Sequence, residues 1–305
     1  TLGDMSLYLA IFRNSQNIFQ SLFFGLSDLY ENSLFMSNLF SFLDLEPLMP
    51  IAAHPVELPR PIVQGIEFKH VSFQYADRPA YALKDVNLTI KPGEKIALVG
   101  ANGAGKTTLV KLLTRLYDPT EGQITIDGID LRDVDPKELQ KRIGVIFQDF
   151  VKYFLPAREN IGFGQIDRLD DEERIIDSSK RSGAHETLSA LPQGYATMLG
   201  KWFEKGNDLS GGEWQKVALG RAFMREAEVL VLDEPTASLD ALNEYAIFQR
   251  FRELTDNKIA LLISHRFSTV RMADRIIVLE HGAVTEMGTH QSLVDLGGMY
   301  AKLFN

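Results

Sequence analysis

Eight consecutive residues limit the possible fold of this chain more than any others. They read Gly100-Ala-Asn-Gly-Ala-Gly-Lys106-Thr107 and match the pattern G-x-x-x-x-G-K-[ST]. A short apolar run, Ile96–Val99, precedes them, and a helical pattern, Leu109–Leu116, follows. This context indicates a phosphate-binding loop rather than a chance glycine turn, because glycines let backbone N–H groups turn inward and the helix N-terminus adds partial positive charge.

The loop predicts ATP and Mg²⁺ as ligands. Lys106 is expected to reach the β- and γ-phosphates, and the hydroxyl of Thr107 can ligate Mg²⁺. The residues of the loop and helix start that we expect to hold the nucleotide are Gly100, Asn102, Gly103, Ala104, Gly105, Lys106, Thr107 and Thr108.

A second apolar run, Val229–Leu232, ends in two carboxylates, Asp233 and Glu234. An aspartate at the end of a strand beside a phosphate loop can hold Mg²⁺, and the next carboxylate can polarise the attacking water as a general base. A helix-capping pair after a core strand is the alternative. The phosphate loop upstream favours the catalytic interpretation.

Between these two motifs lies Leu209-Ser210-Gly211-Gly212-Glu213, which resembles the signature motif of ABC-transporter ATPases. Ser210 and the two glycines stand where a helix would start, which makes a second anion cradle. The resemblance implies that two such domains meet head-to-tail, as a homodimer or a heterodimer. Each ATP then lies between the phosphate loop of one chain and Ser210, Gly211 and Gly212 of the other.

The resemblance covers residues 66–305 and assigns four more positions. Tyr75 resembles the aromatic that stacks on adenine, and Gln148 the glutamine that touches Mg²⁺ or the attacking water. Asp240 lies in a Ser-Leu-Asp loop that crosses to the partner, and His265 resembles the histidine that contacts the γ-phosphate. The plainer alternatives are a core aromatic for Tyr75, a solvated amide for Gln148 and a structural histidine for His265. The implied catalytic set is Glu234, His265, Gln148 and Lys106, and the implied metal ligands are Thr107, Gln148 and Asp233.

Apolar patterning predicts an α/β fold with strands of two kinds. Apolar and polar residues alternate from Ile66 to Tyr75, and a break in the alternation at Lys69-His70 suggests a bulge. The alternation is seen again at residues 86–90. Ile124 and Ile126 precede Asp127-Gly128 as in a hairpin. Apolar runs at 229–232, 259–263 and 275–279 each follow a helical stretch, which favours a parallel sheet. With the resemblance, the expected fold is a P-loop NTPase ABC ATPase domain: a parallel-sheet core, an antiparallel β subdomain and an α-helical subdomain at about 149–225.

Two different segments precede this domain. Residues 1–46 are rich in Leu, Phe and Ser, with apolar residues three or four apart, as in a long helix. Residues 47–65 hold five of the twelve prolines and predict a linker. The helix is either an amphipathic helix that packs on the domain or, as the exporter class implies, the end of a transmembrane helix. No run of 18 apolar residues occurs, so no complete membrane span is predicted. Because the first residue is Thr rather than Met and no signal-peptide pattern follows it, we expect a fragment or a processed chain.

The predicted function is ATP hydrolysis that drives an ABC exporter, with the membrane domain in the same polypeptide and this domain on the cytoplasmic side of the cell membrane. The substrate is left open among peptide, lipid and drug-like molecules. The alternatives are an importer's separate ATPase subunit and a soluble non-transport ABC ATPase. A net charge of −9 argues against nucleic acid as a partner, and the absence of cysteine excludes disulfides and thiol catalysis.

The chain departs from the family pattern at two places. Glu213 replaces the usual glutamine of the signature motif. Upstream, residues 199–206 carry an enlarged loop in which Glu204 best matches the family's acidic residue and Trp202 and Phe203 are added. These aromatics are expected either to pack against the membrane domain or to fill the helical subdomain.

Overall fold

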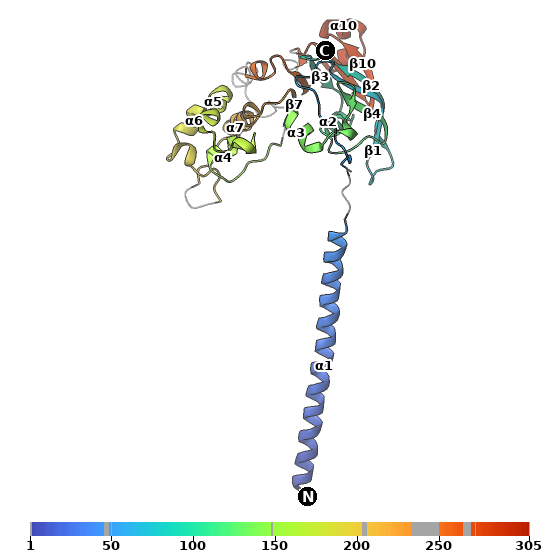
Figure 1. Cartoon of the computed structure of the whole chain (residues 1–305), viewed down its shortest axis with the longest axis vertical. Coiled ribbons are helices and arrows are strands. Elements are labelled where there is room, and N and C mark those ends of the chain that lie inside the picture. Colours follow the sequence, from blue (N-terminus) through green and yellow to red (C-terminus); the bar gives the residue numbers. More distant parts are fainter. Residues whose placement is uncertain are drawn as a thin grey trace. The chain divides into compact units, whose positions relative to one another are not determined.

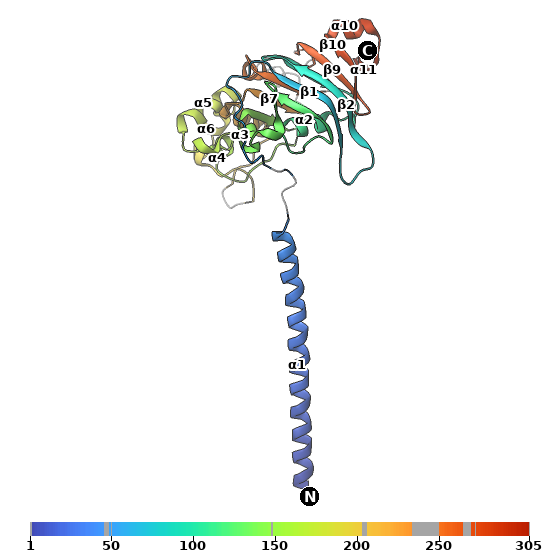
Figure 2. The same ribbon diagram turned by 45° about the vertical axis from the view of Figure 1, so that its right-hand side comes forward.

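The computed structural model describes residues 2–45, 49, 51–147, 149–202, 206–233, 250–264, 270–271 and 273–304. The chain divides into two compact units, Thr1–Pro50 and Ile51–Asn305. The elements of each unit can be followed in Figures 1 and 2.

The first unit consists of one helix, α1 (Leu2–Leu43), which confirms the helix expected in this region. Its 42 residues rise about 63 Å at 1.5 Å per residue. None of its described side chains is buried, and Phe23 and Leu29 are 70% and 68% exposed. No helix in the described ranges is both long and apolar enough to cross a membrane. The apolar side chains of α1 are therefore not covered within this unit.

The second unit begins with an antiparallel sheet in the order β2-β1-β4-β5. The strands are β1 (Ile66–Gln74), β2 (Tyr81–Ile90), β4 (Glu121–Ile126) and β5 (Ile129–Asp130). The register of β1 shifts between Phe68 and Val71, where His70 takes a φ of 50°, so the predicted bulge is confirmed. Asp127 and Gly128 form the predicted two-residue turn, with φ of 52° and 81°.

A second, six-stranded sheet follows the order β10-β9-β3-β8-β7-β6. Its strands are β3 (Lys95–Val99), β6 (Ile143–Ile146), β7 (Val229–Asp233), β8 (Ile259–Ile263), β9 (Arg275–Glu280) and β10 (Ala283–Gly288). All described pairs are parallel except β9 with β10. The parallel sheet was predicted, and β6 and β10 are two further strands that the sequence pattern did not reveal.

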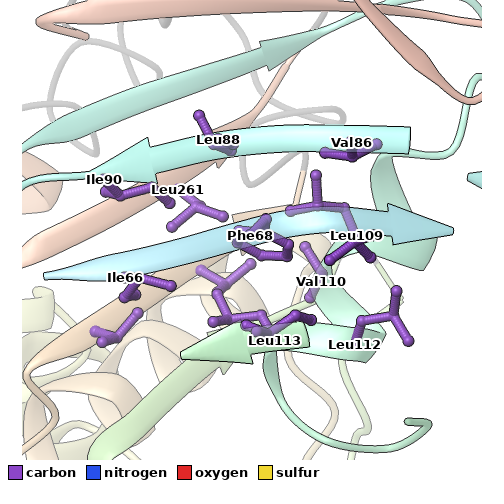
Figure 3. Packing of buried hydrophobic residues seen from close by; sticks show 14 of the residues in the cluster. Ile66, Phe68, Val86, Leu88, Ile90, Leu109, Val110, Leu112, Leu113 and Leu261 are labelled. Atoms are coloured by element: carbon purple, nitrogen blue, oxygen red, sulfur yellow. The ribbon is translucent and has the colours of Figure 1, made fainter. Parts of the chain in front are cut away.

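The main hydrophobic core forms where helix α2 (Lys106–Leu113) packs with both sheets. Leu109 and Leu113 are fully buried and belong to one cluster with Ile66 and Phe68 of β1 and Leu261 of β8. Figure 3 shows these side chains together. Burial of each Leu or Phe side chain contributes roughly 1.5–3 kcal/mol, so the cluster firmly fixes the start of α2 relative to the strands.

A second hydrophobic core lies among the helices of the middle region. It is formed by α4 (Ala157–Gly162), α5 (Glu172–Ser182), α6 (His185–Ser189) and α7 (Gly211–Met224). Trp214 of α7 is 1% exposed and packs with Ile161, Ile175 and Leu188. Other helices in the described ranges are η1 (Leu131–Asp133), α3 (Pro136–Arg142), η2 (Ile166–Arg168), η3 (Gly194–Ala196), α10 (His290–Leu296) and α11 (Met299–Phe304).

Candidate functional site

The phosphate loop connects the carboxyl end of β3 to the amino end of α2, and at two of its glycines a side chain would collide with neighbouring backbone. Gly100 has a φ of 154°, and a Cβ there would lie 2.3 Å from the carbonyl oxygen of Leu279. Gly105 is the N-cap of α2 with a φ of 108°, and its Cβ would lie 2.8 Å from the carbonyl oxygen of Ala82. The loop backbone is therefore pressed against β9 and β2, which fixes its curvature.

Lys106, the first residue of α2, folds back over the loop that precedes it. Its Nζ donates to the carbonyl oxygens of Gly100 at 2.6 Å and Ala101 at 3.0 Å, and the residue is 8% exposed. These contacts hold the ammonium group at the concave side of the loop, beside the amino end of a helix. Both the lysine charge and the helix terminus favour an anion there.

A cavity of about 500 Å³ opens at this loop, which is the size of a small-molecule site. It brings together predicted residues from three parts of the sequence: Tyr75, the loop residues 102–108, and Asp233. Five lining residues were not foreseen: Arg78, Ala80, Tyr81, Ala82 and Ile263. Four of them, Arg78, Ala80, Tyr81 and Ala82, follow Tyr75 closely in the sequence, and this proximity was the signal that could have placed them in the cavity wall.

Tyr75, placed directly after β1, is held at the cavity wall by aromatic and polar contacts. Its ring meets Phe73 edge-on at 4.8 Å and Tyr117 at 5.4 Å between centroids. Its hydroxyl lies 3.2 Å from Oγ1 of Thr108, and Nζ of Lys111 lies 5.5 Å from its ring centroid. The Tyr75 ring is therefore held in place by these neighbours and forms part of the cavity wall.

Asp233 ends β7 beside Ile263, the last residue of β8, and both line the cavity with Thr107. A carboxylate and a hydroxyl near a phosphate site are the hard oxygen donors that Mg²⁺ takes, together with phosphate oxygens and water. The described residues contain no cluster of three or more His, Cys, Asp or Glu side chains suited to a metal ion. The carboxylate of Asp233 and the hydroxyl of Thr107 fit a Mg²⁺ ion that takes further ligands from the nucleotide and water.

Four predicted site residues, Gln148, Glu234, Asp240 and His265, lie outside the described residues, as do Phe203 and Glu204 of the enlarged loop. Their sequence neighbours locate the ends of these segments. Phe147 follows β6, Asp233 ends β7, and Ser264 follows β8. Their roles remain predictions.

The signature residues stand at the start of α7, which confirms that a helix begins there. Ser210 is the N-cap, and its Oγ accepts a hydrogen bond from the backbone N–H of Glu213 at 3.3 Å. The Glu213 carboxylate in turn accepts from the backbone N–H of Ser210 at 2.7 Å. This reciprocal capping box gives the unusual Glu213 a structural role. Ser210, Gly211 and Gly212 are not among the residues that line the cavity at the phosphate loop.

The capping box has a measurable contribution to stability. Replacement of Glu213 by alanine should lower the free energy of unfolding by about 1 kcal/mol, because one helix-terminal N–H loses its acceptor. Glu213→Gln keeps an acceptor oxygen and should retain most of the stability. Urea unfolding followed by circular dichroism measures both, and an alanine variant as stable as the parent chain would contradict this role.

Farther along α7, Arg221 ties the helix to the segment that follows β6. It donates to the carbonyl oxygens of Val151 at 2.6 Å and Asn160 at 2.7 Å, and its Cζ lies 4.8 Å from the ring centroid of Tyr153. Burial lowers the pKa of Arg221 to about 10, so it stays charged at neutral pH. The signature helix and the segment after Gln148 are therefore joined through a charged group.

Trp202 of the enlarged loop does not fill the helical core. It is 82% exposed and stacks on Phe154 with centroids 5.7 Å apart and planes at 18°. The core position is taken by Trp214 instead. The expectation that Trp202 fills the helical subdomain is therefore wrong, because this side chain contacts Phe154 at the surface of that subdomain.

Comparison with known proteins agrees with this geometry. Residues 83–237, half of the chain, match the family model described as ABC transporter. The chain is 38% identical over 99% of its length to the subtilin transport ATP-binding protein SpaT of Bacillus subtilis, and covers 49% of that protein. It is 42% identical over 87% of its length to the ATP-dependent lipid A-core flippase of Syntrophus aciditrophicus (strain SB), and covers 43% of it.

A solved structure of a bacterial Atm1-family ABC exporter with ATP bound superposes with a TM-score of 0.81 at 32% identity, covering 90% of this chain and 47% of that one. The chain thus spans about half the length of the relatives that it matches. The phosphate loop, the acidic strand end and these matches together show that the chain belongs to the ABC transporter family and contains its ATPase fold.

Proposed function

We propose that the whole protein is an ABC exporter in which this domain hydrolyses Mg-ATP to power transport. The observation that carries the proposal is the single cavity into which Lys106, Thr107 and Asp233 converge. The matched relatives are named for subtilin transport, lipid A-core flipping and multidrug export, which supports a peptide, lipid or drug-like substrate.

The proposed reaction is in-line attack of water on the γ-phosphate of ATP, which gives ADP and phosphate. Lys106 binds the β- and γ-phosphate oxygens, and His265 contacts the γ-phosphate. Glu234 accepts the proton of the attacking water. Tyr75 stacks on the adenine, while the backbone N–H groups of residues 102–108 surround the phosphates.

Thr107, Asp233 and Gln148 would hold Mg²⁺, which neutralises charge on the phosphate oxygens when it is bound. Thr107 and Asp233 already face one cavity, which supports their part of this assignment. The role of Gln148 rests on the sequence alone.

We further propose that the active unit contains two such domains. Ser210, Gly211 and Gly212 stand at the amino-terminal end of α7, where a helix favours an anion, yet they do not line the cavity of their own chain. A second domain in head-to-tail arrangement would add its cradle to the γ-phosphate, with Asp240 at the crossing. Because this chain carries a complete set of site residues, a homodimer with two active sites is sufficient, and a heterodimer is equally compatible.

The remaining segments fit a membrane domain in the same polypeptide. We propose that residues 1–46 are the end of its last helix, 47–65 the linker and 66–305 the nucleotide-binding domain, with a helical subdomain at about 149–225. The exposed apolar side chains of α1 support this division. The domain would then lie on the cytoplasmic side of the cell membrane.

Fractionation of the whole protein tests the exporter proposal. When the protein is produced in bacteria, alkaline carbonate should leave it in the membranes, and mild detergent should release it with ATPase activity. Release by carbonate would favour the importer subunit, since such a subunit binds only at the membrane surface. Recovery in the cytosol would favour a non-transport ABC ATPase.

A further inference from the structure

The proline-rich linker is bonded to the ATPase domain over its second half. The backbone N–H of Val56 donates to the carbonyl oxygen of Asp133 at 2.8 Å. The backbone N–H of Ile62 donates to Oε2 of Glu228 at 2.8 Å. Ile62 is 8% exposed and Leu58 packs against the same hydrophobic core. Residues 56–62 are therefore part of the domain surface rather than a free tether.

Arg142, the last residue of α3, is the main polar partner of this segment. It is 4% exposed, and its guanidinium donates to the carbonyl oxygens of Leu58 at 3.1 Å and Pro59 at 2.6 Å. Its Nε lies 2.7 Å from Oε1 of Glu228, a charge contact in which the N–H is not aimed for a hydrogen bond. We name Arg142 and Glu228, with the bonds that they make to residues 58–62, the linker clamp.

The burial of Arg142 makes its hydrogen bonds to the linker energetically important. The Arg142 guanidinium is buried, so its N–H groups need acceptors, and the linker carbonyls supply two of them. Departure of the linker would leave a buried charge partly unsatisfied, unless the surrounding structure changed as well. Attachment of the linker is therefore coupled to the positions of Arg142, at the end of α3, and of Glu228, which immediately precedes β7.

The clamp stands at the amino ends of strands whose carboxyl ends line the nucleotide cavity. Glu228 immediately precedes β7, which ends at Asp233. The carbonyl oxygen of Glu228 accepts from the N–H of Ile259, the first residue of β8, which ends at Ile263. Asp233 and Ile263 both line the cavity. At about 3.3 Å per residue, only about 17 Å of strand separates clamp and cavity.

Both strands are buried along this path. The residues from 229 to 232 and from 259 to 263 are at most 2% exposed, and the two strands pair in parallel over five residues. Close packing of this kind gives low compressibility and transmits strain along the strands. We therefore expect a displacement at Glu228 to be transmitted along β7 to Asp233.

We propose that Arg142 and Glu228 are positioning residues through which the linker and the nucleotide site control each other along β7 and β8. The proposal rests on the proposed function, because the linker would carry the membrane helix. Since coupling between two sites is reciprocal, nucleotide in the cavity must then change how firmly residues 56–62 are held.

Hydrogen–deuterium exchange on the full chain tests the proposal, with Mg²⁺ and a non-hydrolysable ATP analogue as the probe. In the parent chain, the amides of Val56 and Ile62 should exchange at least about threefold more slowly when the analogue is bound. Arg142→Lys keeps a positive charge near Glu228 but replaces the two separate donor nitrogens of the guanidinium fork with one ammonium nitrogen on a shorter stem. It should speed exchange of these amides about tenfold and abolish their response to the analogue.

Glu228→Gln provides a second variant at a less buried position, with the same expected loss of response. Lys141→Met is the matched control, because Lys141 is the adjacent residue of α3 and forms only an exposed pair with Glu138. It should respond as the parent chain does. Binding of a fluorescent ATP analogue is measured in parallel and should stay within about threefold in every variant.

The possible outcomes distinguish failure of the proposed function from failure of the clamp proposal. No analogue binding by the parent chain would refute the proposed function itself. Binding without any change at Val56 and Ile62 would overturn the clamp proposal alone. A response that persists in both Arg142→Lys and Glu228→Gln would overturn it as well, because the linker would then sense nucleotide by another route.

Discussion

ATP hydrolysis should fall by at least about a hundredfold when Lys106 is replaced with methionine, because one preorganised charge on the transferring phosphoryl group is lost. Methionine keeps the unbranched stem and the apolar contacts but removes the ammonium group. That group is held at the loop by the carbonyl oxygens of Gly100 and Ala101. Phosphate release at saturating Mg-ATP measures the loss.

Lys180→Met is the matched control for this substitution. Lys180 lies on the exposed side of α5, away from the cavity, so the same chemical change should leave the rate within about twofold. Equal thermal unfolding of both variants would show that the fold is intact. Hydrolysis by Lys106→Met at a rate close to that of the control would refute the role given to the loop lysine.

The second large effect is expected at Glu234. Replacement by glutamine keeps the size of the side chain and removes the proton acceptor, so hydrolysis should fall by about 10² to 10⁴. Binding should persist, because Lys106, Thr107 and Asp233 remain in the cavity. Single-turnover experiments with radiolabelled ATP separate the two effects.

The same variant tests the two-domain site. If hydrolysis is what reopens the dimer, Glu234→Gln should accumulate as an ATP-bound dimer on size-exclusion chromatography, while the parent chain should not. Glu253→Gln serves as the control, since its carboxylate forms an exposed pair with Arg181. Stable ATP-bound dimers that still hydrolyse ATP at the parent rate would refute the assignment of Glu234 as the general base.

Local patterns predicted the parts of the fold whose causes are local. The bulge at His70 interrupts a two-residue alternation, and the turn at Asp127-Gly128 needs two positive φ values, so both leave a mark in a few residues. Strand β6 follows Arg142 directly and is only four residues long, which is too short for its period to be recognised. Strand β10 is an edge strand with partly exposed residues throughout, so it lacks a continuous apolar run.

The candidate site divides in the same way. The phosphate loop is a continuous motif, and the strand before it and the helix after it identify it without any long-range information. Arg78 and Tyr81 line the cavity only because β1 and β2 place their connecting loop beside α2, which no local pattern records. The bond between Ile62 and Glu228 spans 166 positions and depends wholly on the folded chain.

The cavity has walls from both sheets, and this has a thermodynamic consequence. Tyr81 and Ala82 come from the antiparallel sheet, whereas Asp233 and Ile263 come from the parallel one. A nucleotide bound in the cavity would therefore contact both sheets. A ligand at a hundredfold excess over its dissociation constant stabilises the folded state by about 2.7 kcal/mol. Because the nucleotide would contact both sheets, we expect loss of ATP to remove part of the free energy that keeps them packed together.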